Sequence, residues 1–292
     1  MNPDPNENEQ AHPRHRQAFW LAGRFLLPFD PVRLSDAPAW RRAAVWLPVW
    51  GLLIGIAYAA AFRIAWLWLG EYRGVRVAPM VLLLVLDAGW FGYRLLEGAA
   101  HVVGSWRRTP TTTSLTPPAA GQASPAATVL IVLGLLVKFA LLVSLPAGAV
   151  SWPADWREHL WIAYPYVIYR PLVLMPVWGR WTVLLASSIG RVSADGSPRL
   201  RELARGNSMV TVMTYWAAAT ALTVMYCSPS GRHVAWSMLI SLGMLLIAYL
   251  VSFTLVRRFG GQTESTVTAA GWLVEFAFLL AYLPVARAIY WY

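Results

Sequence analysis

Four ionisable side chains recur at helical spacing within one apolar segment of the chain. Asp87, Arg94 and His101 are each seven residues apart. Glu97 lies between the last two. At about 100° per residue, a seven-residue step returns to within about 20° of its starting direction, so a continuous helix would carry these groups on one face. Ionisable groups inside a membrane span are costly and commonly mark a functional site. The spacing therefore predicts a polar functional stripe, the 87–101 stripe, within a hydrophobic span.

Glu97 and His101 form the most chemically suggestive pair of the stripe. Their separation of four residues places a carboxylate and an imidazole one helical turn apart on the same face. Such a pair can hold a metal ion or a phosphate-bound cation together with other ligands. The alternative is a pair of solvated side chains at the membrane surface, and the spacing alone leaves both interpretations open.

Composition limits the kind of protein that contains this stripe. The chain has 292 residues, of which 58% are hydrophobic and 13% charged, and its mean hydropathy is +0.49. These values indicate a polytopic membrane protein. The 17 Trp and 12 Tyr residues suit the two membrane interfaces. The single Cys excludes an intramolecular disulfide and any site built from several cysteines.

The apolar runs predict an all-α fold with about seven transmembrane helices. Residues 1–18 are rich in Pro, Asn and Glu and predict a disordered tail. Residues 19–292 then form a single transmembrane helical domain. At about 20 apolar residues per crossing, the spans are expected near 44–69, 77–100, 128–148, 160–189, 208–228, 234–256 and 267–289. Prolines 165, 171 and 176 predict that the fourth segment is kinked or divided.

The arginines predict the orientation of the chain. With a cytoplasmic N-terminus, the expected inside segments hold fourteen arginines and the outside loops hold four, as the positive-inside rule requires. This distribution also explains the net charge of +10 without nucleic acid as a partner. We therefore expect a multi-pass protein of the inner (plasma) membrane, in contact with membrane lipid, whose active face is cytoplasmic. The sequence specifies no oligomeric state.

Several of the charges expected within spans require partners. Lys138 and Glu275 either compensate each other or form the floor of a polar cavity. Asp87 is expected to pair with a cation from another helix, and three are available in the sequence: Lys138, Arg63 and Arg180. Arg94 either contacts a substrate phosphate or turns toward Glu97.

The segment 260–266, Gly-Gly-Gln-Thr-Glu-Ser-Thr, leads directly into the last expected span. Its hydroxyl groups suit helix capping. A glycine-rich turn before a helix N-terminus also suits phosphate binding.

The order of these segments resembles that of the cobalamin synthase family, the adenosylcobinamide-GDP ribazoletransferases. Residues 25–29 (Phe-Leu-Leu-Pro-Phe) are similar to the opening of the family. Residues 47–55 (Leu-Pro-Val-Trp-Gly-Leu-Leu-Ile-Gly) are similar to its first apolar helix. Residues 136–140 (Leu-Val-Lys-Phe-Ala) and 176–181 (Pro-Val-Trp-Gly-Arg-Trp) resemble two later motifs. The resemblance extends from about residue 18 to 290.

The second half of the stripe corresponds to the acidic metal motif of that family, Leu-Asp-Gly-x-x-Asp-Thr-x-Asp-Gly. Glu97 replaces its first Asp, His101 the second and Gly104 the third. A Lys-Asp-Ser-Arg-x-Gly loop of the family corresponds to residues 119–127, where Gln122 and Ser124 are the polar positions. The resemblance implies Mg²⁺ as the cofactor, and the altered ligands leave three alternatives: Mn²⁺, Zn²⁺ or no metal.

The resemblance implies that ribazole, or its phosphate, is joined to adenosylcobinamide-GDP with release of GMP, in the last steps of cobalamin synthesis. Corrinoid and nucleotide-type substrates would then be the partners. It implies a catalytic and metal-binding role for Glu97 and His101. The residues assigned to substrate binding or its support are Arg94, Arg180, Gln122, Thr263, Glu264 and Glu275. The alternative hypothesis is a diverged, non-catalytic membrane protein that binds a corrinoid, a lipid or a partner protein.

Overall fold

The computed structural model describes residues 5–28, 37–69, 77–106, 125–145, 168–194, 196–228 and 233–290. The regular structure within these ranges is helical, apart from one isolated bridge between Val192 and Gln262. The predicted all-α fold is therefore confirmed. The long helices are α3 (Leu47–Leu69), α6 (Pro125–Val143), α7 (Tyr169–Ser188), α9 (Met209–Cys227), α10 (Val234–Phe259) and α11 (Glu264–Tyr290). The remaining elements are α1 (Pro5–Leu26), α2 (Ala37–Ala43), η1 (Ala44–Trp46), α4 (Val77–Leu86), η2 (Asp87–Phe91), α5 (Tyr93–Trp106) and α8 (Pro198–Gly206).

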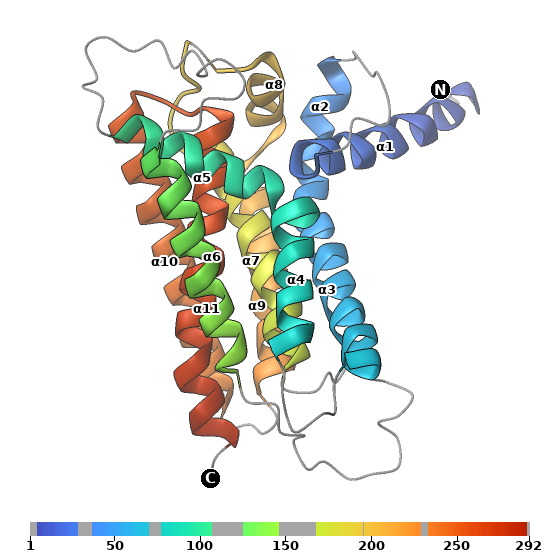
Figure 1. Ribbon diagram of the computed structural model, residues 1–292. Helices are drawn as coiled ribbons and strands as arrows, with labels where there is room; N and C mark the ends of the chain where they lie inside the picture. Colours follow the sequence, from blue (N-terminus) through green and yellow to red (C-terminus); the bar gives the residue numbers. More distant parts are fainter. Residues whose placement is uncertain are drawn as a thin grey trace.

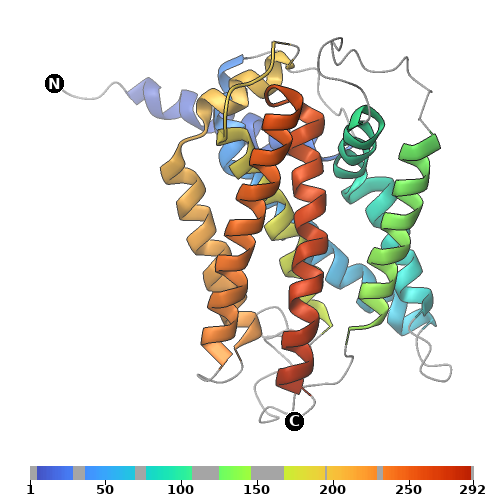
Figure 2. The ribbon, with the colours of Figure 1, turned by 90° about the vertical axis from the view of Figure 1, so that its left-hand side faces the viewer.

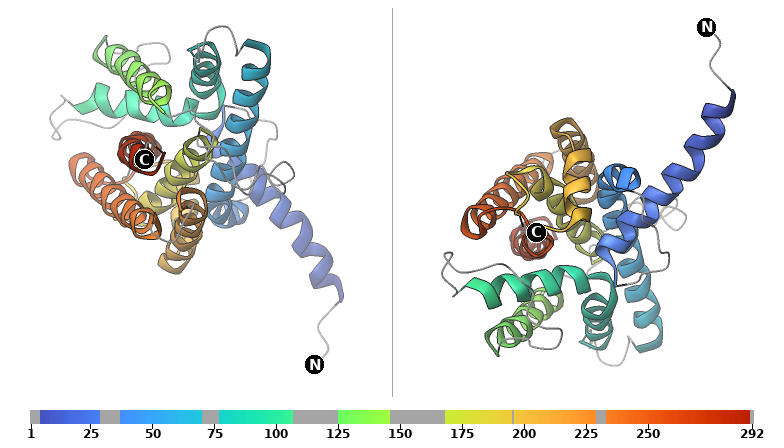
Figure 3. Two further views of the ribbon diagram at one scale, coloured as in Figure 1. Left: turned by 90° about the horizontal axis from the view of Figure 1, so that it is seen from below. Right: turned by 90° about the horizontal axis from the view of Figure 1, so that it is seen from above.

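The long helices form a bundle around α7 (Figures 1 and 3). Every residue of α7 from Tyr169 to Ser187 is buried. Figure 2 shows α9, α10 and α11 side by side on one part of the bundle, with α4 and α6 on the other. Outward-facing side chains are apolar: Leu67 is 73% exposed and Val210 is 76% exposed. An apolar exterior around a buried central helix is typical of a bundle that contacts lipid.

Within the described ranges, four helices have the length and hydropathy needed to cross a membrane, namely Trp40–Leu69, Met209–Cys227, Val234–Phe259 and Glu264–Arg287. A fifth candidate is the bent pair Val77–Phe91 and Tyr93–Trp106. The shorter helix Ala127–Val143 is also apolar. The protein is therefore a membrane protein, as composition predicted. In the fourth predicted segment, α7 begins at Tyr169 and contains Pro176, while residues 160–167 lie outside the described ranges.

Small residues allow α3 to approach the central helix. A side chain at Gly51 would lie 2.8 Å from the carbonyl oxygen of Pro176, and one at Gly55 would lie 2.7 Å from the Cα of Val173. Glycines four residues apart let helix backbones pack closely in a membrane, where dispersion contacts replace much of the hydrophobic effect. This contact fixes α3 against α7. It thereby also fixes the position of Tyr58, which α3 carries.

The second predicted span is not a continuous helix. α4 ends at Leu86, the five-residue π-helical turn η2 follows, and α5 leaves at 77° to the preceding segment. As a result, α5 runs across the end of the bundle instead of along it (Figure 1). The predicted 87–101 stripe is therefore wrong as a single helical face. Asp87 belongs to the buried turn, whereas Arg94, Glu97 and His101 belong to α5.

The end of the bundle near α5 also carries α1, α2 and α8 (Figure 1). α1 begins at Pro5, so helix covers most of the 1–18 segment for which composition predicted disorder. Its second half is fixed by aromatic contacts: the rings of Phe19 and Trp50 stack at 4.9 Å, and Trp50 Nε1 donates to the Phe19 carbonyl at 2.8 Å. Figure 3 shows the N-terminal part of α1 projecting sideways from the bundle.

Candidate functional site

Four buried charges from four different elements meet below the α4–α5 bend. This buried quartet consists of Asp87 (η2), Lys138 (α6), Arg180 (α7) and Glu275 (α11). Lys138 Nζ lies 2.6 Å from Asp87 Oδ2 and 2.8 Å from Glu275 Oε2. Arg180 Nη1 pairs with Glu275 Oε1. The predicted compensation of Lys138 by Glu275 is confirmed, and Lys138 is the cation that pairs with Asp87.

Two neutral groups complete the polar network around the quartet. The Tyr58 hydroxyl donates to Asp87 Oδ1. Arg180 Nη2 donates to the carbonyl oxygen of Phe91, the last residue of η2. The side chains of Lys138, Arg180 and Glu275 are at most 1% exposed. Two cations and two carboxylates leave the quartet neutral, which offsets the high cost of burying each charge away from water.

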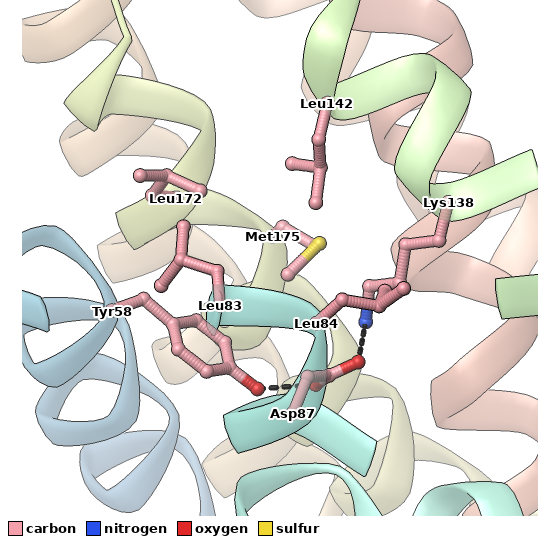
Figure 4. Close-up of a pocket in the computed structure, with 8 residues that line it drawn as sticks. All are labelled: Tyr58, Leu83, Leu84, Asp87, Lys138, Leu142, Leu172 and Met175. Carbon is pink, nitrogen blue, oxygen red and sulfur yellow. Dashed lines mark hydrogen bonds and ion pairs between the residues drawn. The ribbon is translucent and has the colours of Figure 1, made fainter. Parts of the chain in front are cut away.

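A small cavity adjoins the quartet on the side of Tyr58 (Figure 4). The cavity has a volume of about 10 Å³. This is roughly the size of one water molecule. Tyr58, Asp87 and Lys138 contribute to its lining, together with the apolar residues Leu83, Leu84, Leu142, Leu172 and Met175. The cavity is far too small for a nucleotide or a corrinoid.

The polar residues of α5 form a separate group nearer the surface. Arg94 Nη1 lies 3.1 Å from Glu97 Oε2, and each side chain is 37% exposed. His101 is partly buried one turn further along α5. Arg94 has therefore turned toward Glu97, as one of the two sequence hypotheses stated. We call Arg94, Glu97 and His101 the α5 surface group.

A close helix contact brings the α5 surface group to the start of α11. A side chain at Gly98 would lie 2.8 Å from the carbonyl oxygen of Ser265 and 3.0 Å from Thr268 Cβ. Gly98 follows Glu97 directly, so the motif that carries the carboxylate also forms the contact. Two segments that are more than 150 residues apart in the sequence thus meet at one point.

Replacing Gly98 by alanine should separate α5 from α11 and destabilise the protein by about 1–3 kcal/mol, because overpacking forces backbone shifts. Gly243→Ala in α10 is the matched control, since nothing lies within 4 Å of a side chain added there. Thermal unfolding in detergent micelles measures both variants. Equal melting temperatures would contradict the close contact at Gly98.

The turn before α11 is a capped and clamped structure. Gly260 adopts the left-handed conformation that ends α10, with φ of 67°. Thr266 N donates to Thr263 Oγ1 at 3.2 Å, and Thr263 N donates to Thr266 Oγ1 at 2.9 Å, which is a reciprocal capping box. The Gln262 side chain donates to the carbonyl oxygens of Ala186 and Ile189 at the end of α7. The capping explanation for this segment is therefore confirmed, and it accounts for Thr263.

Glu264 connects two helix starts. Its carboxylate accepts a hydrogen bond from the Ser197 hydroxyl, which in turn accepts from Leu200 N at 3.1 Å as the N-cap of α8. Sequence reasoning missed Ser197 and also missed Tyr58. Ser-Pro at 197–198 is a recognisable helix start, but no local pattern connects it to Glu264. Tyr58 lies in an apolar helix without any polar neighbour to mark it.

The structure divides the predicted site residues into two layers. Arg180 and Glu275 are fully buried in the quartet. Arg94, Glu97, His101 and Glu264 are partly exposed near the bundle end. Gln122 lies outside the described ranges. The α4–α5 bend joins the two layers. The turn η2 contributes Asp87 to the buried layer, and α5 carries Arg94, Glu97 and His101 of the partly exposed layer.

The donor set of α5 does not form a resident metal site by itself. Among the residues that the structure describes, no group of three or more His, Cys, Asp and Glu side chains converges closely enough to hold an ion. Glu97 and His101 supply one carboxylate and one imidazole, and the carboxylate is already paired with Arg94. Mg²⁺ requires near-octahedral oxygen ligands, so these side chains do not match it.

Comparison with known proteins yields one family. The sequence profile of the family described as cobalamin-5-phosphate synthase matches residues 18–283. The comparisons with curated proteins and with solved structures gave no match.

Proposed function

Because the chain belongs to the cobalamin-5-phosphate synthase family, with a role in cobalamin biosynthesis, we propose that it joins ribazole or its phosphate to adenosylcobinamide-GDP and releases GMP. The observation that carries the proposal is the contact of Gly98 with α11. It brings the segment that corresponds to the acidic motif of the family against the start of α11, which directly follows the glycine-rich turn 260–263. Both segments lie at one end of the bundle, where α5 crosses it (Figure 1).

In this reaction, a hydroxyl oxygen of the acceptor attacks the phosphorus that bears the cobinamide. A new P–O bond forms there, the P–O bond to GMP breaks, and GMP leaves with the bonding electrons. Attack on a pyrophosphate depends chiefly on positioning and on neutralising phosphate charge. Arg94 is the partly exposed guanidinium suited to the phosphates. Glu97 or His101 accepts the proton of the attacking hydroxyl, and Glu264 and Glu275 support the site.

The proposal includes a membrane orientation. Exposed arginines occur at the bundle end that carries α2 and α8, at positions 41, 42, 199, 201 and 205. By the positive-inside rule, these arginines support a proposal in which this end and the N-terminus face the cytoplasm of the inner (plasma) membrane. We further propose seven crossings, as the apolar runs predicted. The substrates, which carry phosphate groups, would approach this cationic surface from the cytoplasm.

The test is GMP release by the purified full-length protein in detergent or lipid nanodiscs. Adenosylcobinamide-GDP is supplied with ribazole or ribazole phosphate, and Mg²⁺, Mn²⁺ or Zn²⁺ is added in separate reactions. We expect GMP and a cobalamin product in equal amounts with at least one metal. No GMP with any metal would overturn the transfer reaction and favour the non-catalytic alternative, in which the same chain binds a corrinoid, a lipid or a partner protein.

A further inference from the structure

The break between α4 and α5 coincides with the buried quartet. Asp87, the first residue of η2, supplies a carboxylate of the quartet, and Phe91, the last residue, supplies a carbonyl bonded by Arg180. Sharp changes of helix direction need an identifiable cause, and a π-helical turn is one of them. Here both ends of the turn are bound to charged side chains from other helices.

The bonds to η2 come from three sides. The Asp87 carboxylate accepts hydrogen bonds from the Tyr58 hydroxyl of α3 and from Lys138 Nζ of α6 (Figure 4). Arg180 from α7 donates to the Phe91 carbonyl and is itself held by Glu275 of α11. The turn therefore has little freedom to unwind into a straight helix, because straightening would leave buried charges without partners.

The far end of α5 is held independently. Arg258 Nη2 donates to the Trp106 carbonyl at 2.8 Å, and the same guanidinium lies 5.8 Å from the centre of the Trp106 ring. A cation bonded to the last carbonyl of a helix also interacts favourably with its dipole. With η2 fixed at one end and Trp106 at the other, the direction of α5 across the bundle is defined.

We propose that the buried quartet is a positioning device, which holds the α4–α5 bend and thereby sets the α5 surface group against the start of α11. Arg180 and Glu275 then act through the turn, without contacting substrate. Asp87, Lys138 and Tyr58 join them as positioning residues. The effect on catalysis rests on the proposed transferase function, whereas the effect on the direction of α5 does not.

The direction of α5 can be measured as a distance between two spin labels. Cysteines replace Val103 on α5 and Leu250 on α10, which is 51% exposed on the bundle surface. Cys227 is buried and is first changed to alanine, so that only the two introduced thiols carry labels. The full-length protein in nanodiscs should give one narrow distance distribution.

Two substitutions weaken the network at Asp87, and a third is the control. Asp87→Asn keeps the shape of the side chain but removes the charge that pairs with Lys138. Tyr58→Phe removes only the hydroxyl that donates to Asp87 and is the milder variant if Asp87→Asn does not fold. Glu202→Gln is the matched control, because it removes a carboxylate that pairs with Arg41 in α2 and lies outside the bend.

We expect Asp87→Asn to shift or broaden the label distance, Tyr58→Phe to do so less, and Glu202→Gln to leave it unchanged. If the transfer reaction is confirmed, kcat should fall by about 100-fold in Asp87→Asn, since small misplacements of reacting groups have effects of this size. KM should change little, because the α5 surface group keeps its side chains.

An unchanged narrow distribution in Asp87→Asn and Tyr58→Phe would overturn the proposal, whatever happens to activity. A shifted distance in a protein that releases no GMP would instead refute the transferase function and leave the positioning role intact. The two failures are therefore distinguishable.

Discussion

Replacing Lys138 by methionine should lower the free energy of unfolding by about 3–5 kcal/mol, because it removes one partner of a buried ion pair. Lys138 bridges Asp87 and Glu275. After the substitution Glu275 still has Arg180, whereas the buried carboxylate of Asp87 keeps, among the described residues, only the hydroxyl of Tyr58. Methionine matches the length and apolar stem of lysine. The loss of stability therefore measures the removal of the charge and not the creation of a cavity.

A double variant tests that explanation. Asp87→Asn combined with Lys138→Met removes one positive and one negative charge and leaves the Arg180–Glu275 pair balanced. It should recover most of the stability lost by Lys138→Met alone, since buried pairs can be replaced by neutral groups at little net cost. Unfolding in detergent, followed by tryptophan fluorescence, completes the double-mutant cycle. Additive losses in the two single variants would contradict the pairing of Lys138 with Asp87.

Replacing Glu97 by glutamine should reduce GMP release by at least about 100-fold if its carboxylate is the general base, which is the lower end of the usual range for such groups. The melting temperature should change little, because the Arg94–Glu97 pair is partly exposed and such pairs contribute at most about 1 kcal/mol. Loss of activity without loss of stability is the result that identifies a catalytic group.

The matched measurements are kcat and KM for Glu97→Gln, His101→Asn and the control Glu202→Gln on α8. The control should retain full activity, because the Glu202 carboxylate pairs with Arg41 and Arg205 away from α5. If Glu97→Gln is fully active and His101→Asn is not, the proton passes to the imidazole instead. Full activity in both variants would exclude Glu97 and His101 from catalysis.

Local patterns in the sequence were sufficient for the membrane class and the helices. Apolar length and composition are properties of short segments, so the spans around 208–228, 234–256 and 267–289 coincide with α9, α10 and α11. The capping of α11 by Thr263 and Thr266 is equally local, since both partners lie within one helical turn. The family, shown by the match over residues 18–283, was also suggested by the order of motifs along the chain.

The sequence by itself thus determined an all-helical membrane protein, its family and the charges that would need partners. Only the tertiary structure decided how those charges pair and where the second predicted span breaks. Asp87 had three possible cations, and the choice of Lys138 depends on the packing of α6 against η2. The bend likewise depends on Tyr58, Lys138 and Arg180 from other helices. Periodicity describes one segment at a time, whereas a buried ion pair depends on every helix that surrounds it.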